Sequence, residues 1–191
     1  MIRAHFLFAG VVGTASLATL TVPVSRFAVW NATASVPTGL YAIRGKANLH
    51  VGERIGIEPP PELRGLLAER GYLPTGVLLI KRIAAVSGQR VCRFGHGVTI
   101  DGDFAGVARA RDSRGRLLPA WFGCRKLRSG ELFVMNPAAP DSFDGRYFGA
   151  LSRDTVIGRA TPVWTDEAGD GHRVWFANPR EPFSQTTDQG D

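Results

Sequence analysis

The stretch Val77-Leu-Leu-Ile-Lys-Arg-Ile-Ala-Ala-Val86 decides the fold class, because it is an apolar run with the length and composition of a β-strand. Two cationic residues, Lys81 and Arg82, interrupt the run. Alternate side chains of a strand point to opposite faces, so Lys81 shares a face with Leu79 and Ile83, and Arg82 points the other way. The pattern predicts a strand that carries one ammonium group among aliphatic side chains.

Lys81 is therefore a candidate for proton transfer. Burial among aliphatic groups removes hydration from the ammonium and lowers its pKa from about 10.4 toward the neutral range. A lysine that is neutral near physiological pH can accept a proton as a general base. The alternative is a lysine on an edge strand, whose amine extends into solvent.

Short β-like runs separated by Gly, Pro and Asp residues surround this strand and predict a sheet-rich domain. They cover residues 41–43, 54–58, 90–93, 98–100, 131–135 and 155–164. One helix is expected from Pro60 or Pro61 to Arg70, with three leucines on one face and Gly71 as its C-terminal stop. The expected fold class is mainly β, with one short helix.

The N-terminal segment carries no charged residue over residues 6–24, which is close to the length that a helix needs to cross a bilayer. Arg3 and Arg26 flank this run. We predict an uncleaved transmembrane helix, with a cleaved secretory signal ending near Ala18 as the alternative. Either interpretation exports the rest of the chain.

The chain length accommodates one catalytic domain and an anchor. We expect a membrane anchor or signal segment over residues 1–27. The catalytic domain is expected over residues 28–166, and a poorly structured tail over residues 167–191.

The formal net charge of +6 does not by itself define a partner. Lys and Arg residues are scattered, without a dense basic tract or an interleaved aromatic stripe, so no nucleic-acid partner is expected. The four histidines lack zinc-site spacing, and neither a metal nor another cofactor is expected.

The two cysteines, Cys92 and Cys124, form an even count behind an export segment. This count predicts one disulfide in an oxidising compartment. Two unpaired buried thiols are the alternative.

The stretch Asn31-Ala-Thr-Ala-Ser-Val-Pro-Thr-Gly-Leu-Tyr41 contains a candidate nucleophile, Ser35. Pro37 and Gly39 stiffen and bend the backbone, so that a serine can be held exposed on a fixed turn. Ser35 alone is equally a turn or capping serine, because nucleophilic chemistry requires a base such as Lys81.

A third stretch, Asn136-Pro-Ala-Ala-Pro-Asp-Ser-Phe-Asp-Gly-Arg-Tyr-Phe-Gly149, contains two carboxylates, an arginine and aromatic residues. In an extended backbone, Asp144 and Arg146 point the same way and can pair to orient neighbouring groups. The alternative is a surface ion pair of little energetic value.

The segments Ser35-Val-Pro-Thr-Gly39, Lys81-Arg-Ile-Ala-Ala-Val-Ser-Gly88 and Asp141-Ser-Phe-Asp-Gly-Arg-Tyr-Phe-Gly149 resemble, in order and spacing, the motifs of the signal peptidase I family. Arg70-Gly-Tyr-Leu-Pro-Thr-Gly76 is similar to the TraF branch, the conjugative-transfer signal peptidases. The resemblance runs from about residue 32 to residue 164.

The resemblance implies a signal-peptidase-like β-sheet catalytic domain in the periplasm, attached to the inner (cytoplasmic) membrane. It implies a serine endopeptidase with Ser35 as nucleophile and Lys81 as general base. Asp144 would be a supporting carboxylate, with Arg146 as its ion-pair partner. Thr33 would occupy the place of an oxyanion donor.

The resemblance to the TraF branch also implies a substrate, an exported pilin-like precursor of a conjugative type IV secretion system. The acyl-enzyme would be resolved by water or by the substrate's own amino group, which closes a ring. A non-catalytic, membrane-tethered component of the conjugative pilus or secretion apparatus is the alternative, although it leaves Lys81 unexplained. A Ser-His-Asp hydrolase that uses His96 or His172 is a further alternative.

Overall fold

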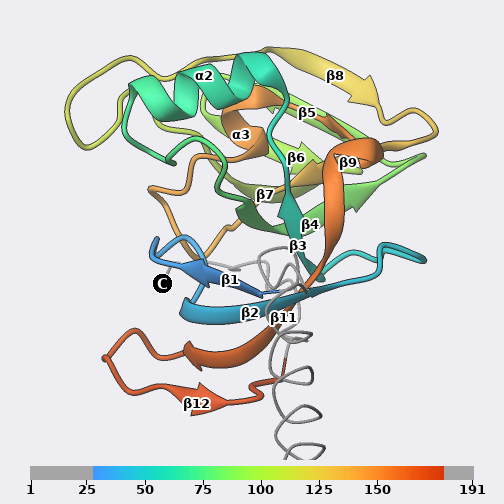
Figure 1. Cartoon of the computed structure of the whole chain (residues 1–191). Helices are drawn as coiled ribbons and strands as arrows, with labels where there is room; N and C mark the ends of the chain where they lie inside the picture. The colour runs from blue at the N-terminus through green and yellow to red at the C-terminus, as the bar shows by residue number, and fades with distance from the viewer. Residues whose placement is uncertain (1–27, 179–191) are drawn as a thin grey trace, which may run out of the picture.

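The computed structural model describes residues 28–178, and the predicted membrane anchor lies outside the described residues. The fold is mainly β (Figure 1). Its strands are β1 (Ala28–Asn31), β2 (Thr38–Arg44), β3 (Arg54–Ile57), β4 (Leu79–Val86), β5 (Arg90–Phe94), β6 (Gly97–Ile100), β7 (Asp103–Val107), β8 (Gly123–Lys126), β9 (Glu131–Val134), β10 (Leu151–Ser152), β11 (Val156–Asp166) and β12 (Val174–Trp175). The helical elements are α2 (Pro61–Glu69), the single turn α3 (Gly145–Phe148) and the 3-10 turn η2 (Arg153–Thr155). Among residues 28–178, no helix is both long and apolar enough to cross a membrane.

The strands form two antiparallel sheets. The larger sheet has the order β1-β2-β11-β3-β4-β9-β10, with β12 paired to β11. The smaller sheet has the order β7-β6-β5-β8. The mainly β class is therefore confirmed, and the single turn α3 adds a helical element to the one helix that was expected.

Strand β4 lies inside the larger sheet, between β3 and β9. Its residues are almost all buried, which explains the apolar composition of the run that contains it. Lys81 pairs with Ile55 of β3, and only 2% of its surface is exposed. The edge-strand interpretation of Lys81 is therefore wrong, because hydrogen-bonded neighbours cover the strand on both sides.

The predicted helix is confirmed as α2, which begins with Pro61 in its first turn. Leu63 and Leu67 are its buried residues and join the core over the larger sheet. Gly71 follows with a positive φ of 68°, so it ends the helix as predicted. Leu67 of the helix and Tyr72 and Leu73 of the loop after it line one cavity together with residues of β4.

Strands β2 and β11 approach each other closely. A Cβ atom added at Gly39 would lie 2.2 Å from the carbonyl oxygen of Trp164, and one at Gly158 would lie 2.4 Å from the carbonyl oxygen of Arg44. Both positions therefore require glycine. This close contact fixes the position of β2, and with it the loop from β1 that carries Ser35.

The sheet continues beyond residue 166, where a poorly structured tail over residues 167–191 was expected. Trp175 of β12 lies opposite Trp164 of β11, and their rings stack with centroids 5.7 Å apart. The carboxylate of Asp166 accepts backbone N–H bonds from the turn between the strands. The prediction is wrong for this hairpin, because ring stacking and a capped turn supply order that a polar composition does not reveal. Residues 179–191 lie outside the described residues.

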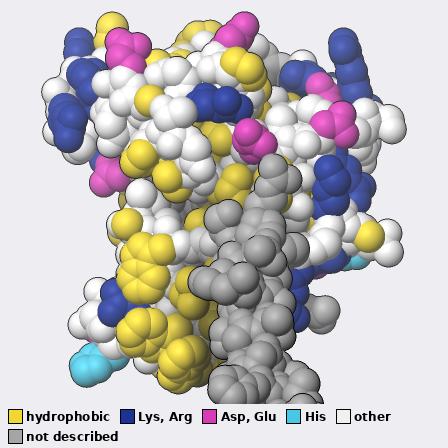
Figure 2. Space-filling model, viewed as in Figure 1, with side chains coloured by type: hydrophobic (Ala, Val, Ile, Leu, Met, Phe, Trp, Pro, Cys, Tyr) yellow, Lys and Arg dark blue, Asp and Glu magenta, His cyan; other side chains and the backbone are white. Residues whose placement is uncertain are grey.

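Aromatic side chains form a connected group on the outside of this hairpin. We define the aromatic patch as Trp30, Trp164, Trp175 and Phe176, whose neighbouring rings lie 5.7–6.3 Å apart. Trp30, Trp175 and Phe176 are at least half exposed. Figure 2 shows hydrophobic side chains gathered at the end of the molecule where β11 and β12 lie.

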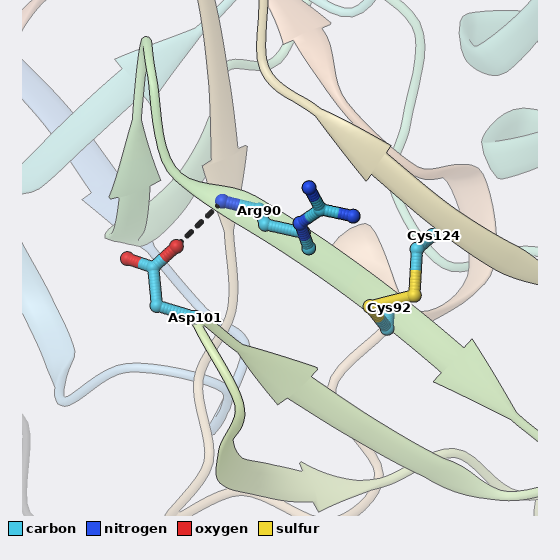
Figure 3. Close-up of a disulfide and its surroundings, with 4 residues drawn as sticks. All are labelled: Arg90, Cys92, Asp101 and Cys124. Atoms are coloured by element: carbon cyan, nitrogen blue, oxygen red, sulfur yellow. Dashed lines mark hydrogen bonds between the residues drawn. A yellow bond between two sulfur atoms is a disulfide. The ribbon is translucent and has the colours of Figure 1, made fainter.

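A disulfide joins Cys92 of β5 to Cys124 of β8, and the predicted pairing is confirmed (Figure 3). The two residues lie directly opposite each other in the strand pair, with their Cα atoms 4.0 Å apart. The bond closes a loop with a sequence separation of 32 and stabilises the fold by about 2–4 kcal/mol, mainly by constraining the unfolded chain. Asp101 accepts the backbone N–H of Arg90 at the start of β5, over 2.7 Å.

Candidate active site

The loop between β1 and β2 holds Ser35 in a fixed position. The side-chain amide of Asn31 donates to the carbonyl oxygens of Thr33 and Pro37 over 2.8 and 3.1 Å. The hydroxyl of Tyr41 donates to the same carbonyl of Pro37 over 2.8 Å. Ser35 is partly exposed on this loop, as the predicted stiff turn requires.

The structure brings Ser35 and Lys81 into contact. Lys81 Nζ lies 2.9 Å from Ser35 Oγ and 2.8 Å from the Oγ of a second serine, Ser142. The amine therefore lies between two hydroxyl groups and is oriented toward the nucleophile candidate. The sequence prediction did not include Ser142, although it lies inside the third quoted stretch.

The surroundings of Lys81 adjust its affinity for a proton. The pKa of Lys81 is lowered from its usual value to about 8: burial lowers it most, the negative charge of Asp144 partly opposes that shift, and the positive charge of Arg146 adds to it. An amine with a pKa of about 8 is about half neutral at pH 8, so a substantial population can accept a proton.

Asp144 and Arg146 form the predicted ion pair, but it is buried and has a different backbone geometry. Their side chains are 0% and 2% exposed and join through two hydrogen bonds of 2.9 Å. Asp144 also accepts the backbone N–H of Asn136, over 3.0 Å. The extended backbone that we expected is wrong, because Asp144 is the N-cap of α3 and its carboxylate accepts the N–H of Arg146. The surface-pair alternative is also wrong.

Asn136 is a second residue that the sequence prediction missed. Its side-chain amide donates to the carbonyl oxygen of Ser35 over 2.6 Å and accepts the backbone N–H of Arg82 over 2.9 Å. Asn136 therefore connects the Ser35 loop to β4, and its own backbone N–H is bound by Asp144. Its place at the start of the third quoted stretch, directly before a proline, was the available signal.

Thr33 Oγ1 lies 3.4 Å from Ser35 Oγ and donates to the side chain of Asn31 over 2.9 Å. Thr33 is therefore close to the nucleophile candidate. Its role as an oxyanion donor remains a prediction.

A cavity of about 480 Å³ lies beside these groups. Ser35, Lys81 and Ser142 contribute to its wall. Leu67, Tyr72, Leu73, Leu79 and Leu118 supply an apolar part of its lining. The cavity offers space for substrate side chains next to the serine hydroxyl.

We expect Ser142→Ala to lower kcat by about 10-fold or more with little change in KM, because Lys81 loses one of the two hydroxyls that orient its amine. The effect is measured by steady-state cleavage of a peptide substrate. Ser152→Ala, an exposed serine on β10, is the control and should behave like the wild type. Unchanged kcat in Ser142→Ala would show that Ser35 alone suffices to orient the amine.

His96 and His172 were the alternative candidates for the base. The ring of His96, in the turn between β5 and β6, lies 2.9 Å from the carbonyl oxygen of Ala108, whereas Lys81 occupies the position of a base beside Ser35. Across residues 28–178, no three His, Cys, Asp or Glu side chains are arranged to hold a metal ion.

Comparison with known proteins identifies the class. The family described as signal peptidase, peptidase S26, matches residues 1–165, and the chain belongs to this family of serine peptidases. A signal peptidase I from Enterococcus faecalis V583 shares 18% identity, with a TM-score of 0.35 over 62% of this chain and 98% of that chain.

Similarity to curated relatives narrows the position within the family. The plasmid transfer protein TraF of Escherichia coli is 32% identical over 71% of this chain and 81% of its own length. The conjugal transfer protein TraF of Agrobacterium fabrum (strain C58 / ATCC 33970) is 33% identical over 85% of this chain and 97% of its own length. The chain therefore lies in the TraF branch of the signal peptidase I family.

Proposed function

We propose that this protein is a serine endopeptidase in which Ser35 is the nucleophile and Lys81 the general base. The observation that carries the proposal is the 2.9 Å separation between Ser35 Oγ and the buried Lys81 Nζ, at the wall of a cavity. A buried amine beside a serine hydroxyl has no evident use in a purely structural component of a pilus or secretion apparatus. The contact therefore favours the enzyme over that alternative.

The chemistry follows from these two groups. The neutral amine of Lys81 accepts the Oγ proton as Ser35 attacks the carbonyl carbon of the scissile peptide bond. The resulting ammonium gives that proton to the leaving amine, and an acyl-enzyme remains. We assign the backbone N–H of Ser35 and the hydroxyl of Thr33 as donors to the oxyanion.

The acyl-enzyme requires a second nucleophile. Water resolves it by hydrolysis when Lys81 again accepts a proton. A substrate amino group that is held close enough competes with water through its high effective concentration and closes a ring. No cofactor enters either route.

The proposed substrate is an exported pilin-like precursor of a conjugative type IV secretion system. Relatives with plasmid transfer and conjugal transfer names support this assignment. The apolar lining of the cavity supports a peptide substrate whose apolar side chains lie beside the cleavage site.

Mass spectrometry of a co-expressed precursor tests the function. With wild-type enzyme we expect a shortened product, and with Ser35→Ala we expect the intact precursor. A cyclic product is lighter than the hydrolysed product by one water molecule, so the same spectrum separates the two routes. Processing that continues in Ser35→Ala, in cells without another source of the activity, would overturn the proposal.

We further propose that the enzyme is held at the inner membrane with its catalytic domain in the periplasm. The uncharged run over residues 6–24 and the disulfide support export and anchoring. The aromatic patch supports contact with the lipid surface, because Trp side chains favour the membrane–water interface. Trp30 lies five residues before Ser35, so this contact would place the site near the bilayer.

We expect Trp175→Ala combined with Phe176→Ala to slow cleavage of a membrane-anchored precursor in proteoliposomes by about 3- to 10-fold, because interfacial aromatic contacts are lost. Cleavage of a soluble peptide should not change. Phe94→Ala removes a similarly exposed ring, 67% exposed, from the smaller sheet and is the matched control. Cleavage of the membrane-anchored precursor by the double variant at the wild-type rate would exclude a role for the patch at the membrane.

A further inference from the structure

The turn that carries the Asp144–Arg146 pair is short and depends on contacts from outside. Helix α3 has only four residues, and an isolated helical turn of that length is unstable. A Cβ atom at Gly145 would lie 2.6 Å from the carbonyl oxygen of Val134, so the turn packs directly against β9. The smaller sheet supplies the contacts on another side of the turn.

Arg93 of β5 provides the first of these contacts. Its side chain is buried, and Nη1 donates to the carbonyl oxygen of Arg146 over 2.5 Å. The adjacent residue, Cys92, forms the disulfide with Cys124 of β8. The guanidinium of Arg93 also lies over the ring of Phe122, at 5.6 Å from its centroid.

Trp121, just before β8, provides the second contact. Its indole N–H donates to the carbonyl oxygen of Gly145 over 2.9 Å. The ring also meets Phe133 edge to face, with centroids 6.2 Å apart. A third contact comes from β7, where the carbonyl oxygen of Val107 accepts from Arg146 Nη1 over 3.1 Å.

The disulfide joins the two donors into one unit. Strand β8 lies at the edge of its sheet, beside β5, and the bond between Cys92 and Cys124 links these two strands covalently (Figure 3). Arg93 is one residue from one half-cystine, and Trp121 is three residues from the other. The two donors therefore belong to strand segments that the disulfide links covalently, and they bind adjacent carbonyl groups of the turn.

We propose that Arg93 and Trp121 are positioning residues, through which the disulfide-linked sheet holds the turn of Asp144 and Arg146 at a fixed distance from Lys81. The two donors bind the carbonyl groups of the first two residues after Asp144, so they set where its carboxylate lies. This inference rests on the proposed function, in which neutral Lys81 is the base.

The test compares variants that remove a donor and keep its packing. Trp121→Phe keeps an aromatic ring against Phe133 and removes the indole N–H. Arg93→Met keeps an aliphatic stem and removes the guanidinium. Arg125→Met is the matched control, because Arg125 is an exposed β8 residue that pairs with Glu131.

We expect each positioning variant to lower kcat by about 3- to 10-fold, the effect of one lost hydrogen bond, with KM unchanged. The ascending limb of the pH profile should move to lower pH, because a carboxylate that is held less closely stabilises the ammonium of Lys81 less. Arg125→Met should match the wild type. Unmoved kcat and an unmoved limb in both positioning variants would overturn the proposal.

Trp121→Phe combined with Asp144→Asn separates a positioning role from general destabilisation. If Trp121 acts through Asp144, Trp121→Phe should shift the limb no further once that carboxylate is gone. An equal shift in both backgrounds would overturn the proposal.

A turnover-independent readout distinguishes failure of this inference from failure of the proposed function. NMR titration of ¹³C-labelled lysine follows Lys81 directly. If the wild type and Arg125→Met cleave no substrate, the proposed function fails, and the Lys81 midpoint still reports the effect of Trp121→Phe. An identical midpoint in wild type and Trp121→Phe would again contradict the positioning role.

Discussion

Lys81→Met is expected to lower the rate of substrate cleavage by about 10³-fold or more, because it removes the base that accepts the serine proton. Methionine is unbranched, of similar length and apolar, so it suits a site that is almost fully buried. The melting temperature should therefore stay close to that of the wild type. Steady-state cleavage together with thermal unfolding measures both effects.

The control for this substitution is Lys46→Met, which changes an exposed lysine in the same way and should retain full activity. Ser35→Ala should be as inactive as Lys81→Met, and the double variant should lose little more than either single variant, since the two groups act as one unit. Substantial residual activity in Lys81→Met would remove Lys81 from the role of base.

Asp144→Asn has the second largest expected effect, a decrease in kcat of about 10- to 100-fold with some activity retained. The substitution preserves shape but removes the charge that balances Arg146. The arginine then stays buried without its ionic partner, which costs about 3–5 kcal/mol of folding free energy. Assays must therefore run well below the melting temperature of the variant.

The pH profile provides the specific signature of Asp144→Asn. Only neutral Lys81 is active, so activity rises with pH through the pKa of Lys81, which is about 8 in the wild type. The negative charge of Asp144 raises that pKa and the positive charge of Arg146 lowers it. Loss of the carboxylate charge therefore lowers the pKa of Lys81, and the ascending limb moves to lower pH.

The control variant is Asp103→Asn, which changes an exposed carboxylate on β7. Its turnover and the ascending limb of its pH profile should match those of the wild type. Turnover like that of the wild type and an unmoved limb in Asp144→Asn would mean that the buried pair serves the fold without influencing Lys81.

Several features of the fold could be predicted because they depend on residues close together in the sequence. The apolar run around Lys81 predicts β4, since alternation and β-branched composition act within a few residues. Pro61 and Gly71 predict the ends of α2 for the same reason. Cys92 and Cys124 were paired correctly because the chain contains two cysteines, which leave one possible partner for each.

The geometry of the site depends on tertiary structure. Ser35, Ser142 and Asn136 are brought to β4 by the path of the chain, over sequence separations of 46 residues from Ser35 to Lys81, 61 from Lys81 to Ser142 and 101 from Ser35 to Asn136. Local sequence patterns were enough to mark a serine, a lysine and an acidic–basic pair as candidates for chemistry. Only the folded chain decided that Asp144 caps a helical turn, and that Arg93 and Trp121 contact this turn. These hydrogen bonds require a particular packing of β5, β8 and β9, and local sequence preferences carry no information on that packing.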